Sequence, residues 1–197
     1  MPVPVVEGVE SYFGLLRTWN RSINLTSLNI EQPADEALDR LLVEPVVAGL
    51  LAASLGARRL VDIGSGGGSP ALPFRLSVPG AVMTLIESRH KKAVFLREAI
   101  RFLGLADTTV EARRLDEVAA AWEPDRRADV ITVRAVRLDG PLFNSVEPML
   151  KPDGRLFLFG TTHNEAQAVA SARFTLEDFR VLTPSSGSHL SILRLLN

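Results

Sequence analysis

A run of glycines between residues 64 and 68 has the residue types and spacing best suited to chemistry in this chain. Four glycines follow residues 60–63, which are apolar except for Asp62, and precede Ser69 and Pro70, where a helical pattern begins. A glycine-rich turn between a buried strand and a helix lets a nucleotide-like cofactor approach bare backbone. Glycine suits such a turn because it lacks Cβ and tolerates positive φ.

The spacing inside this loop discriminates between cofactors. A dinucleotide fingerprint that begins at Gly64 requires glycine or alanine at position 69, and the chain has Ser69 there. The smaller Gly-x-Gly-x-Gly pattern fits better, so a dinucleotide site is disfavoured. We also expect Ser69 to cap the next helix and Pro70 to lie in its first turn. A tight strand–helix connection that binds no ligand is the alternative for the loop alone.

Two acidic residues flank the loop. Glu87 ends the next expected strand, about 20 residues further on, where a carboxylate can accept hydrogen bonds from a ribose diol. Nicotinamide dinucleotides and S-adenosylmethionine both offer such a diol. Asp62 lies inside the strand before the loop, where a carboxylate is costly unless it is paired. We expect Asp62 to bond loop amides or, through water, the cationic end of a cofactor, and structural bracing is an equal alternative.

Other catalytic constellations are missing from the sequence. Tyr12 is the only tyrosine and lies far upstream, which removes the tyrosine base of short-chain dehydrogenases. The three histidines lack metal-ligand spacing, and the loop has neither a P-loop ending nor a Gly-x-Ser-x-Gly elbow. We therefore expect no metal and no general base. Methyl transfer to N7 of guanine suits such a site, because N7 offers a lone pair and carries no proton.

The elements that must position these residues alternate from residue 59 onward. We expect strands at 59–63, 82–86, 108–111, 128–133 and 155–159, and helices near 70–77, 90–103, 115–121, 139–149 and 163–171. This alternation predicts an α/β fold with a mostly parallel sheet. Two further strand-like runs, 174–182 and 190–195, are separated by a turn at 184–187. They predict an antiparallel hairpin at the C-terminal edge of the sheet.

Two helices are expected before the sheet. They cover residues 5–19 and about 35–55, and Pro45 should bend or split the second. The chain then divides into a helical N-terminal cap, 1–56, and a Rossmann-like domain, 57–197.

Basic residues cluster where these elements meet. In open α/β sheets ligands bind beyond the carboxyl ends of the strands. That rule places the glycine loop on the same rim as the clusters at 89–92, 113–114 and 134–137. Lysines and arginines gathered on one side of a fold favour a polyanionic partner.

Composition limits the remaining possibilities. The chain has 197 residues, 46% of them hydrophobic, a net charge of −1 and no cysteine. One globular domain with a small appendage fits that length, and disulfides and thiolate metal sites are excluded. No secretory signal is visible, and the apolar stretch 41–55 is too short for a membrane span. We therefore expect a cytoplasmic monomer without a membrane partner.

Four separated segments, taken together, resemble one known family. The segments are Asn24-Leu25-Thr26-Ser27, Asp62 to Pro70, Glu87-Ser88-Arg89-His90-Lys91-Lys92-Ala93-Val94-Phe95-Leu96 and Val133-Arg134-Ala135-Val136. In this order they resemble the RsmG family, also called glucose-inhibited division protein B. Its members are bacterial class I methyltransferases that methylate N7 of a guanine in 16S ribosomal RNA. The resemblance runs from about residue 15 to the C-terminus, and the third and fourth segments carry more specificity than the glycine loop.

The resemblance implies a set of site residues. S-adenosyl-L-methionine would be the cofactor, held by Asp62, Gly64, Ser65, Gly66, Gly68, Ser69, Glu87, Arg114, Leu115 and Arg134. Glu87 would lie near its ribose and the backbone of Arg114 and Leu115 near its adenine. Arg134, beside the methionine end or the target base, is the candidate catalytic residue. Contacts to the partner, ribosomal RNA or the small ribosomal subunit, would come from Asn24, Lys91 and Arg113.

The chain also departs from the family pattern. Ala71 stands where the family usually has a glycine, and Leu115 stands where the family commonly has an acid. Residues 39–44 differ from the Arg-His-Leu-Leu-Asp-Ser sequence that the family usually has in its second helix. Phe159 replaces a lysine and Ser188 an arginine. These changes remove charge mostly from the RNA-facing side and spare the cofactor loop. Two alternatives therefore remain: a diverged paralogue that methylates another substrate, and a non-catalytic RNA-binding or ribosome-assembly module of the same fold.

Overall fold

A seven-stranded sheet forms the centre of the computed structural model, which describes residues 3–170, 173–183 and 187–196. The strands are β1 (Arg59–Ile63), β2 (Val82–Ile86), β3 (Thr108–Glu111), β4 (Ala128–Arg134), β5 (Leu150–Phe159), β6 (Phe174–Val181) and β7 (His189–Leu195). Their order is β3-β2-β1-β4-β5-β7-β6. Strands β1 to β5 are parallel, and β7 is antiparallel to β5 and β6. The predicted parallel sheet with an antiparallel hairpin at its C-terminal edge is confirmed.

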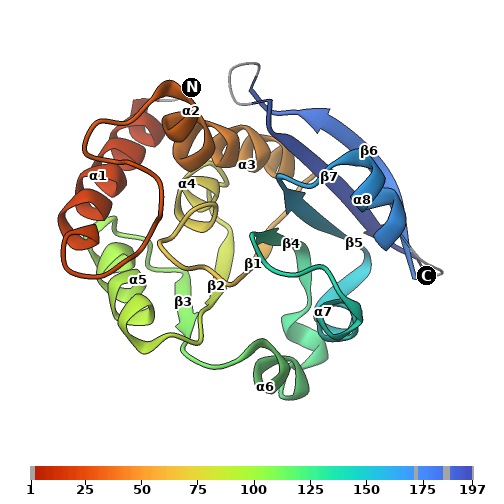
Figure 1. The fold of residues 1–197 in the computed structure, drawn as a ribbon. Coiled ribbons are helices and arrows are strands. Elements are labelled where there is room, and N and C mark those ends of the chain that lie inside the picture. Colours follow the sequence, from red (N-terminus) through yellow and green to blue (C-terminus); the bar gives the residue numbers. More distant parts are fainter. Residues whose placement is uncertain (1–2, 171–172, 184–186, 197) are drawn as a thin grey trace.

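Helices cover both faces of this sheet (Figure 1). They are α1 (Val3–Asn20), α2 (Asp35–Leu38), α3 (Glu44–Ser54), α4 (Ala71–Leu76), α5 (His90–Phe102), α6 (Leu115–Ala120), α7 (Gly140–Val146) and α8 (His163–Val169). A π-helical turn, Asp39–Val43, joins α2 to α3, and 3₁₀ turns cover Pro124–Arg126 and Glu147–Met149. One face carries α1, α3, α4 and α5, and the other carries α6, α7 and α8 (Figure 1).

Alternating side chains of the central strands supply two hydrophobic cores. Leu60 of β1 packs with Tyr12 and Phe74 on the α1–α4 face, and its neighbour Val61 packs with Val146 on the α7 face. Strands that are buried on both faces read as continuous apolar runs. This is why the strand positions were predictable from the sequence.

The structure differs from the expectations at helix ends. The second helix, expected to bend or split at Pro45, is divided into α2, the π turn at 39–43 and α3, and Pro45 lies in the first turn of α3. The hydroxyl of Ser69 donates to the carbonyl of Leu41 at 2.8 Å, so the expected cap at Ser69 is wrong. Pro70 precedes the first residue of α4, and β5 begins five residues earlier than expected, at Leu150.

Some expected features lie outside the described residues. The turn at 184–187 is described only at Gly187, and the expected end of α8 at residue 171 is likewise not described. In the described parts of the chain, no helix combines the length and the apolar character that a membrane crossing needs.

Candidate functional site

Three strands end together at the rim of the sheet and open a cavity there. Ile63 is in register with Ile86 of β2 and Val133 of β4, so β1, β2 and β4 finish at the same level. A cavity of about 570 Å³ lies above this edge. Its wall is built from α1, the segment 24–28, the loop 64–69 and the residues that follow β4.

A second cavity continues the first along the rim. It measures about 420 Å³ and includes Arg113, Arg114 and Leu115 in its wall. Gly64 and Glu87 line both cavities. The two cavities together form an elongated site. One end of this site lies against α1, and the other end lies at the start of α6.

The loop requires glycine both for its backbone conformation and for close packing. Gly66 has φ +53°, in the left-handed region that side chains disfavour. A Cβ on Gly67 would lie 2.9 Å from the carbonyl oxygen of Leu25, so a side chain there would push the 24–28 segment away. Gly68, expected to contact a cofactor, instead lies against Tyr12 and Leu72, where a Cβ would come within 3.2 Å of both.

Tyr12 supports this loop from below. Its side chain is fully buried, and its hydroxyl donates to the carbonyl oxygen of Gly67 at 2.7 Å. Burial raises the pKa of the Tyr12 hydroxyl far above its ordinary value, so it remains a hydrogen-bond donor. The sequence placed this residue far from the site. The available signal was its position on the buried stripe of α1, with Val9 and Leu16.

Asp62 lies buried beneath the loop with one unused oxygen. Thr132 donates to its Oδ1 at 2.5 Å, whereas Oδ2 has no hydrogen-bond partner among the described residues. Burial raises the pKa of Asp62 to about 6, and the hydroxyls of Thr132 and Ser65 partly oppose this rise. The expected bonds from loop amides are therefore not made. An unpartnered buried carboxylate oxygen suits a cationic ligand group.

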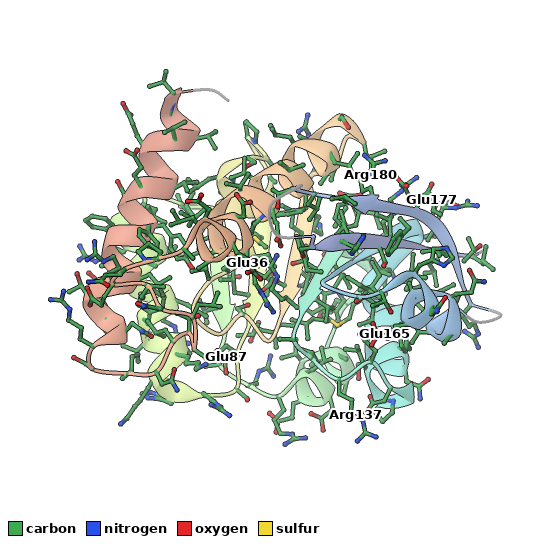
Figure 2. The ribbon with its side chains drawn as sticks, turned by 45° about the horizontal axis from the view of Figure 1, so that its top comes forward. Glu36, Glu87, Arg137, Glu165, Glu177 and Arg180 are labelled. Carbon is green, nitrogen blue, oxygen red and sulfur yellow. The ribbon has the colours of Figure 1, made fainter. Side chains whose placement is uncertain are left out.

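Glu87 fixes the loop to the end of β2. Its carboxylate accepts the amide N–H of Gly66 at 2.8 Å and that of Arg89 at 2.7 Å. The side chain is buried, and it lines both cavities. Figure 2 shows Glu87 on the same side of the molecule as Arg137, away from the Glu177 and Arg180 edge. Each carboxylate oxygen keeps a lone pair for a further donor.

Arg134, at the end of β4, lines the first cavity and is held on several sides. Its Nη2 lies 2.7 Å from Glu44 Oε2, and its Nη1 donates to the carbonyl of Arg40 and, at 3.3 Å, to Ser69 Oγ. The guanidinium lies 4.5 Å above the ring of Phe159. Burial lowers the pKa of Arg134 to about 10, and Glu44 opposes this effect, so the side chain is charged near neutral pH.

The residue after Arg134 has an unusual backbone conformation. Ala135 has φ +55°, which is rare for a residue with a Cβ, and it lines the first cavity. Such conformations concentrate at functional sites, because the surrounding structure must impose them.

The expected substrate-binding residues fall into two places. Asn24 and Lys91 line a cleft of about 430 Å³ that also includes Arg89 and His90 at the start of α5. Asn24 belongs to the first cavity as well. Arg113 instead lines the second cavity and is paired with Glu111 at 2.9 Å. The structure therefore brings Lys91 and Asn24 together and separates both from Arg113.

A family model and the relatives in a search of known proteins point to the same family. The family model described as rRNA small subunit methyltransferase G matches residues 6–189. The relative of that name from Syntrophotalea carbinolica is 32% identical over 201 residues, covering 98% of this chain and 89% of its own length. The relative from Laribacter hongkongensis is 40% identical over 126 residues, covering 63% of this chain. That alignment spans little more than half of the Laribacter protein, 55% of its length.

Solved structures with the same fold include methyltransferases. An O-methyltransferase from Bacillus cereus, solved in complex with SAH, superposes with a TM-score of 0.69 at 16% identity, covering 95% of this chain and 91% of that one. TrmN from Thermus thermophilus gives a TM-score of 0.59 at 21% identity, covering 77% and 48%. These likenesses confirm the expected Rossmann-like class I methyltransferase fold.

Proposed function

The chain belongs to the rRNA small subunit methyltransferase G family, and from that premise we propose that it transfers a methyl group from S-adenosyl-L-methionine to N7 of a guanine in 16S ribosomal RNA. The observation that carries the proposal is the pair of cavities joined at Gly64 and Glu87. An elongated cofactor with an amino-acid end and an adenosine end matches a site of that form.

The chain offers a complementary group to each part of this cofactor. Asp62 lies beneath the loop, outside the wall of either cavity, and its unpartnered Oδ2 would neutralise the ammonium group through water. The remaining lone pairs of Glu87 would accept hydrogen bonds from the ribose hydroxyls. The second cavity, with the backbone of Arg114 and Leu115 in its wall, would take the adenine.

Among the described residues that line the first cavity, the one carboxylate, Glu87, already accepts two backbone amides. When bound, S-adenosyl-L-methionine supplies an electrophilic methyl group on a sulfonium, which a lone pair can accept directly. The hydroxyl of Tyr12 is already donated to Gly67, and the carboxylate of Glu44 is paired with Arg134. An acceptor atom that must lose a proton would be poorly served here. Guanine N7 carries no proton, so positioning and electrostatics suffice.

Arg134 is the cation best placed to orient the acceptor. Its guanidinium lies in the cavity wall, and a guanidinium can hold guanine O6 or a flanking phosphate while N7 stays free. The exposed Lys91 and the other basic residues of the α5 cleft would bind the RNA backbone. The target base must be unstacked or lie in a single-stranded loop, because A-form RNA hides its major-groove edge.

Methyl transfer from labelled S-adenosyl-L-methionine tests this proposal. The purified protein is incubated with small ribosomal subunits or bare 16S rRNA, and the digested RNA is analysed for 7-methylguanosine by mass spectrometry. We expect the label at guanine N7 and its loss in Arg134→Ala. The exposed Arg180→Ala variant on the β6 edge, far from the cavities, serves as the matched control and should retain activity.

Other outcomes identify the alternatives. Label on a different molecule would identify a paralogue with another substrate. RNA binding without cofactor binding in calorimetry would identify a non-catalytic module and exclude every methyltransferase version. Our proposal further includes a monomeric, metal-free protein working in the cytoplasm, which light scattering, metal analysis and cell fractionation would check.

A further inference from the structure

The π turn before α3 leaves backbone carbonyl groups without their helical partners. The amide of Glu44 donates to the carbonyl of Asp39, five residues earlier. The next residue, Pro45, has no N–H to donate. The carbonyl of Arg40 therefore loses both possible partners, the amides at positions 44 and 45, and that of Leu41 loses its α-helical partner at 45.

Both carbonyl groups are instead used by the candidate site. The Leu41 carbonyl accepts the hydroxyl of Ser69, at the end of the glycine loop, at 2.8 Å. The Arg40 carbonyl accepts Nη1 of Arg134. Ser69 and Arg134 also contact each other at 3.3 Å. The proline in the first turn of α3 thus creates the acceptors on which the loop and the arginine rest.

Glu44 completes this arrangement with a charge. Its side chain is fully buried, and its Oε2 lies 2.7 Å from Arg134 Nη2. Its Oε1 has no hydrogen-bond partner among the described residues. A buried pair of this kind is weak as a source of stability, because removing two charges from water offsets their attraction. Its clear effect is geometric, since it fixes one edge of the guanidinium.

Four contacts together determine the orientation of Arg134. The carbonyl of Arg40 and the hydroxyl of Ser69 hold Nη1, Glu44 holds Nη2, and the ring of Phe159 lies beneath the plane. A guanidinium held at both terminal nitrogens and on one face cannot rotate freely. Its remaining N–H groups are then available to a ligand in the cavity.

We propose that Glu44 and Pro45 are positioning residues for Arg134: the carboxylate of Glu44 and the carbonyl groups freed by Pro45 hold its guanidinium at one fixed orientation in the cavity wall. The inference rests on the proposed function where it assigns a catalytic consequence to that orientation. The N-terminal helical segment is then part of the active site and more than a cover over it.

Two substitutions separate the parts of this arrangement. Pro45→Ala restores an N–H that competes with Arg134 and Ser69 for the freed carbonyl groups. Glu44→Gln keeps the size of the side chain and an acceptor but removes the charge. Pro124→Ala is the matched control, because this proline also lies at the start of a short helix but far from the cavities.

NMR of the arginine side chains tests the orientation without relying on activity. In the wild-type protein we expect resolved, slowly exchanging guanidinium signals that disappear in Arg134→Lys and so belong to Arg134. These signals should broaden or merge in Pro45→Ala and in Glu44→Gln, and remain in Pro124→Ala. Unchanged Arg134 signals in both test variants would overturn the proposal, whether or not the protein methylates RNA.

Kinetics then test the consequence for turnover. We expect the single-turnover rate to fall at least tenfold in Glu44→Gln and in Pro45→Ala, while the dissociation constant of the cofactor stays within about threefold. The single-turnover rate should fall by the same factor in Arg134→Lys as in the double variant that also carries Glu44→Gln, because Glu44 acts through Arg134. Losses that multiply in the double variant would refute the positioning role. An inactive wild-type protein with ordered Arg134 signals would instead refute the proposed function alone.

Discussion

The affinity for the cofactor should depend on pH through Asp62. In the unliganded protein burial raises the pKa of Asp62 to about 6. If the ionised carboxylate binds the ammonium group, the fraction able to bind falls from roughly nine-tenths at pH 7 to one-tenth at pH 5. The affinity should therefore weaken about tenfold over that range, or about 1.4 kcal/mol. The ammonium group itself remains protonated there, because its pKa is close to 8.

Calorimetry with S-adenosyl-L-homocysteine at several pH values measures this dependence. The charged or titratable groups that bear on Asp62 are Arg134, which lowers its pKa, and Glu87, which raises it. Asp62→Asn is the control, since it keeps the bond to Thr132 and cannot titrate. It should bind weakly with no change between pH 5 and pH 7. A wild-type affinity that varies less than twofold, or an equal slope in Asp62→Asn, would refute the assignment.

The carboxyl group of Asp62 should also make the stability of the unliganded protein depend on pH. The pKa of Asp62 is raised from 3.8 to about 6, so in the unfolded chain this carboxyl loses its proton first as the pH rises. Between about pH 4 and 6 the folded state binds more protons, and its stability falls with increasing pH. This difference in pKa between the folded and the unfolded chain lowers the unfolding free energy by about 3 kcal/mol above pH 6 relative to its value below pH 4. Urea unfolding of wild type and Asp62→Asn across this range checks both sign and size.

Three further substitutions test the loop and the RNA cleft. Tyr12→Phe removes the donor to the Gly67 carbonyl and should cost about 1–2 kcal/mol of unfolding free energy, measured in urea, with weaker cofactor binding. Gly67→Ala places a methyl group 2.9 Å from the Leu25 carbonyl oxygen and should cost about 1–3 kcal/mol of unfolding free energy, so an unchanged melting temperature would contradict this close packing. Lys91→Ala should weaken RNA binding and reduce its salt slope by about 1, whereas Arg101→Ala, already paired with Glu98 on the same helix, should leave the slope unchanged.

Local sequence patterns predicted the fold because the central strands β1, β2 and β4 are short, mainly apolar runs that are buried on both faces. They also placed the glycine loop, Asp62 and Glu87 correctly at one rim, since the ends of parallel strands meet there. The change of helical register between α2 and α3 was harder to predict from the sequence. The π turn at 39–43 has no strong local signal beyond Pro45, and its course is set by contacts to Arg134 and Ser69.

The contacts that the sequence did not reveal join distant parts of the chain. Tyr12 reaches Gly67 across 55 positions, and Glu44 reaches Arg134 across 90. Each residue alone reads as an ordinary member of an amphipathic helix. Their roles depend on how α1 and α3 pack over the strand ends, which no local pattern encodes.

The placement of β7 has a consequence for the order of folding. β6 precedes β7 in the chain, but β7 lies between β5 and β6 and supplies the strand on which β6 pairs. During synthesis β6 therefore emerges before its docking strand exists. The first cavity uses residues from 12 to 136, so it can assemble on the ribosome while the hairpin is still incomplete. Until β7 arrives, the edge of β5 is an open template for a neighbouring chain, and premature release of the nascent protein at that stage carries an aggregation hazard.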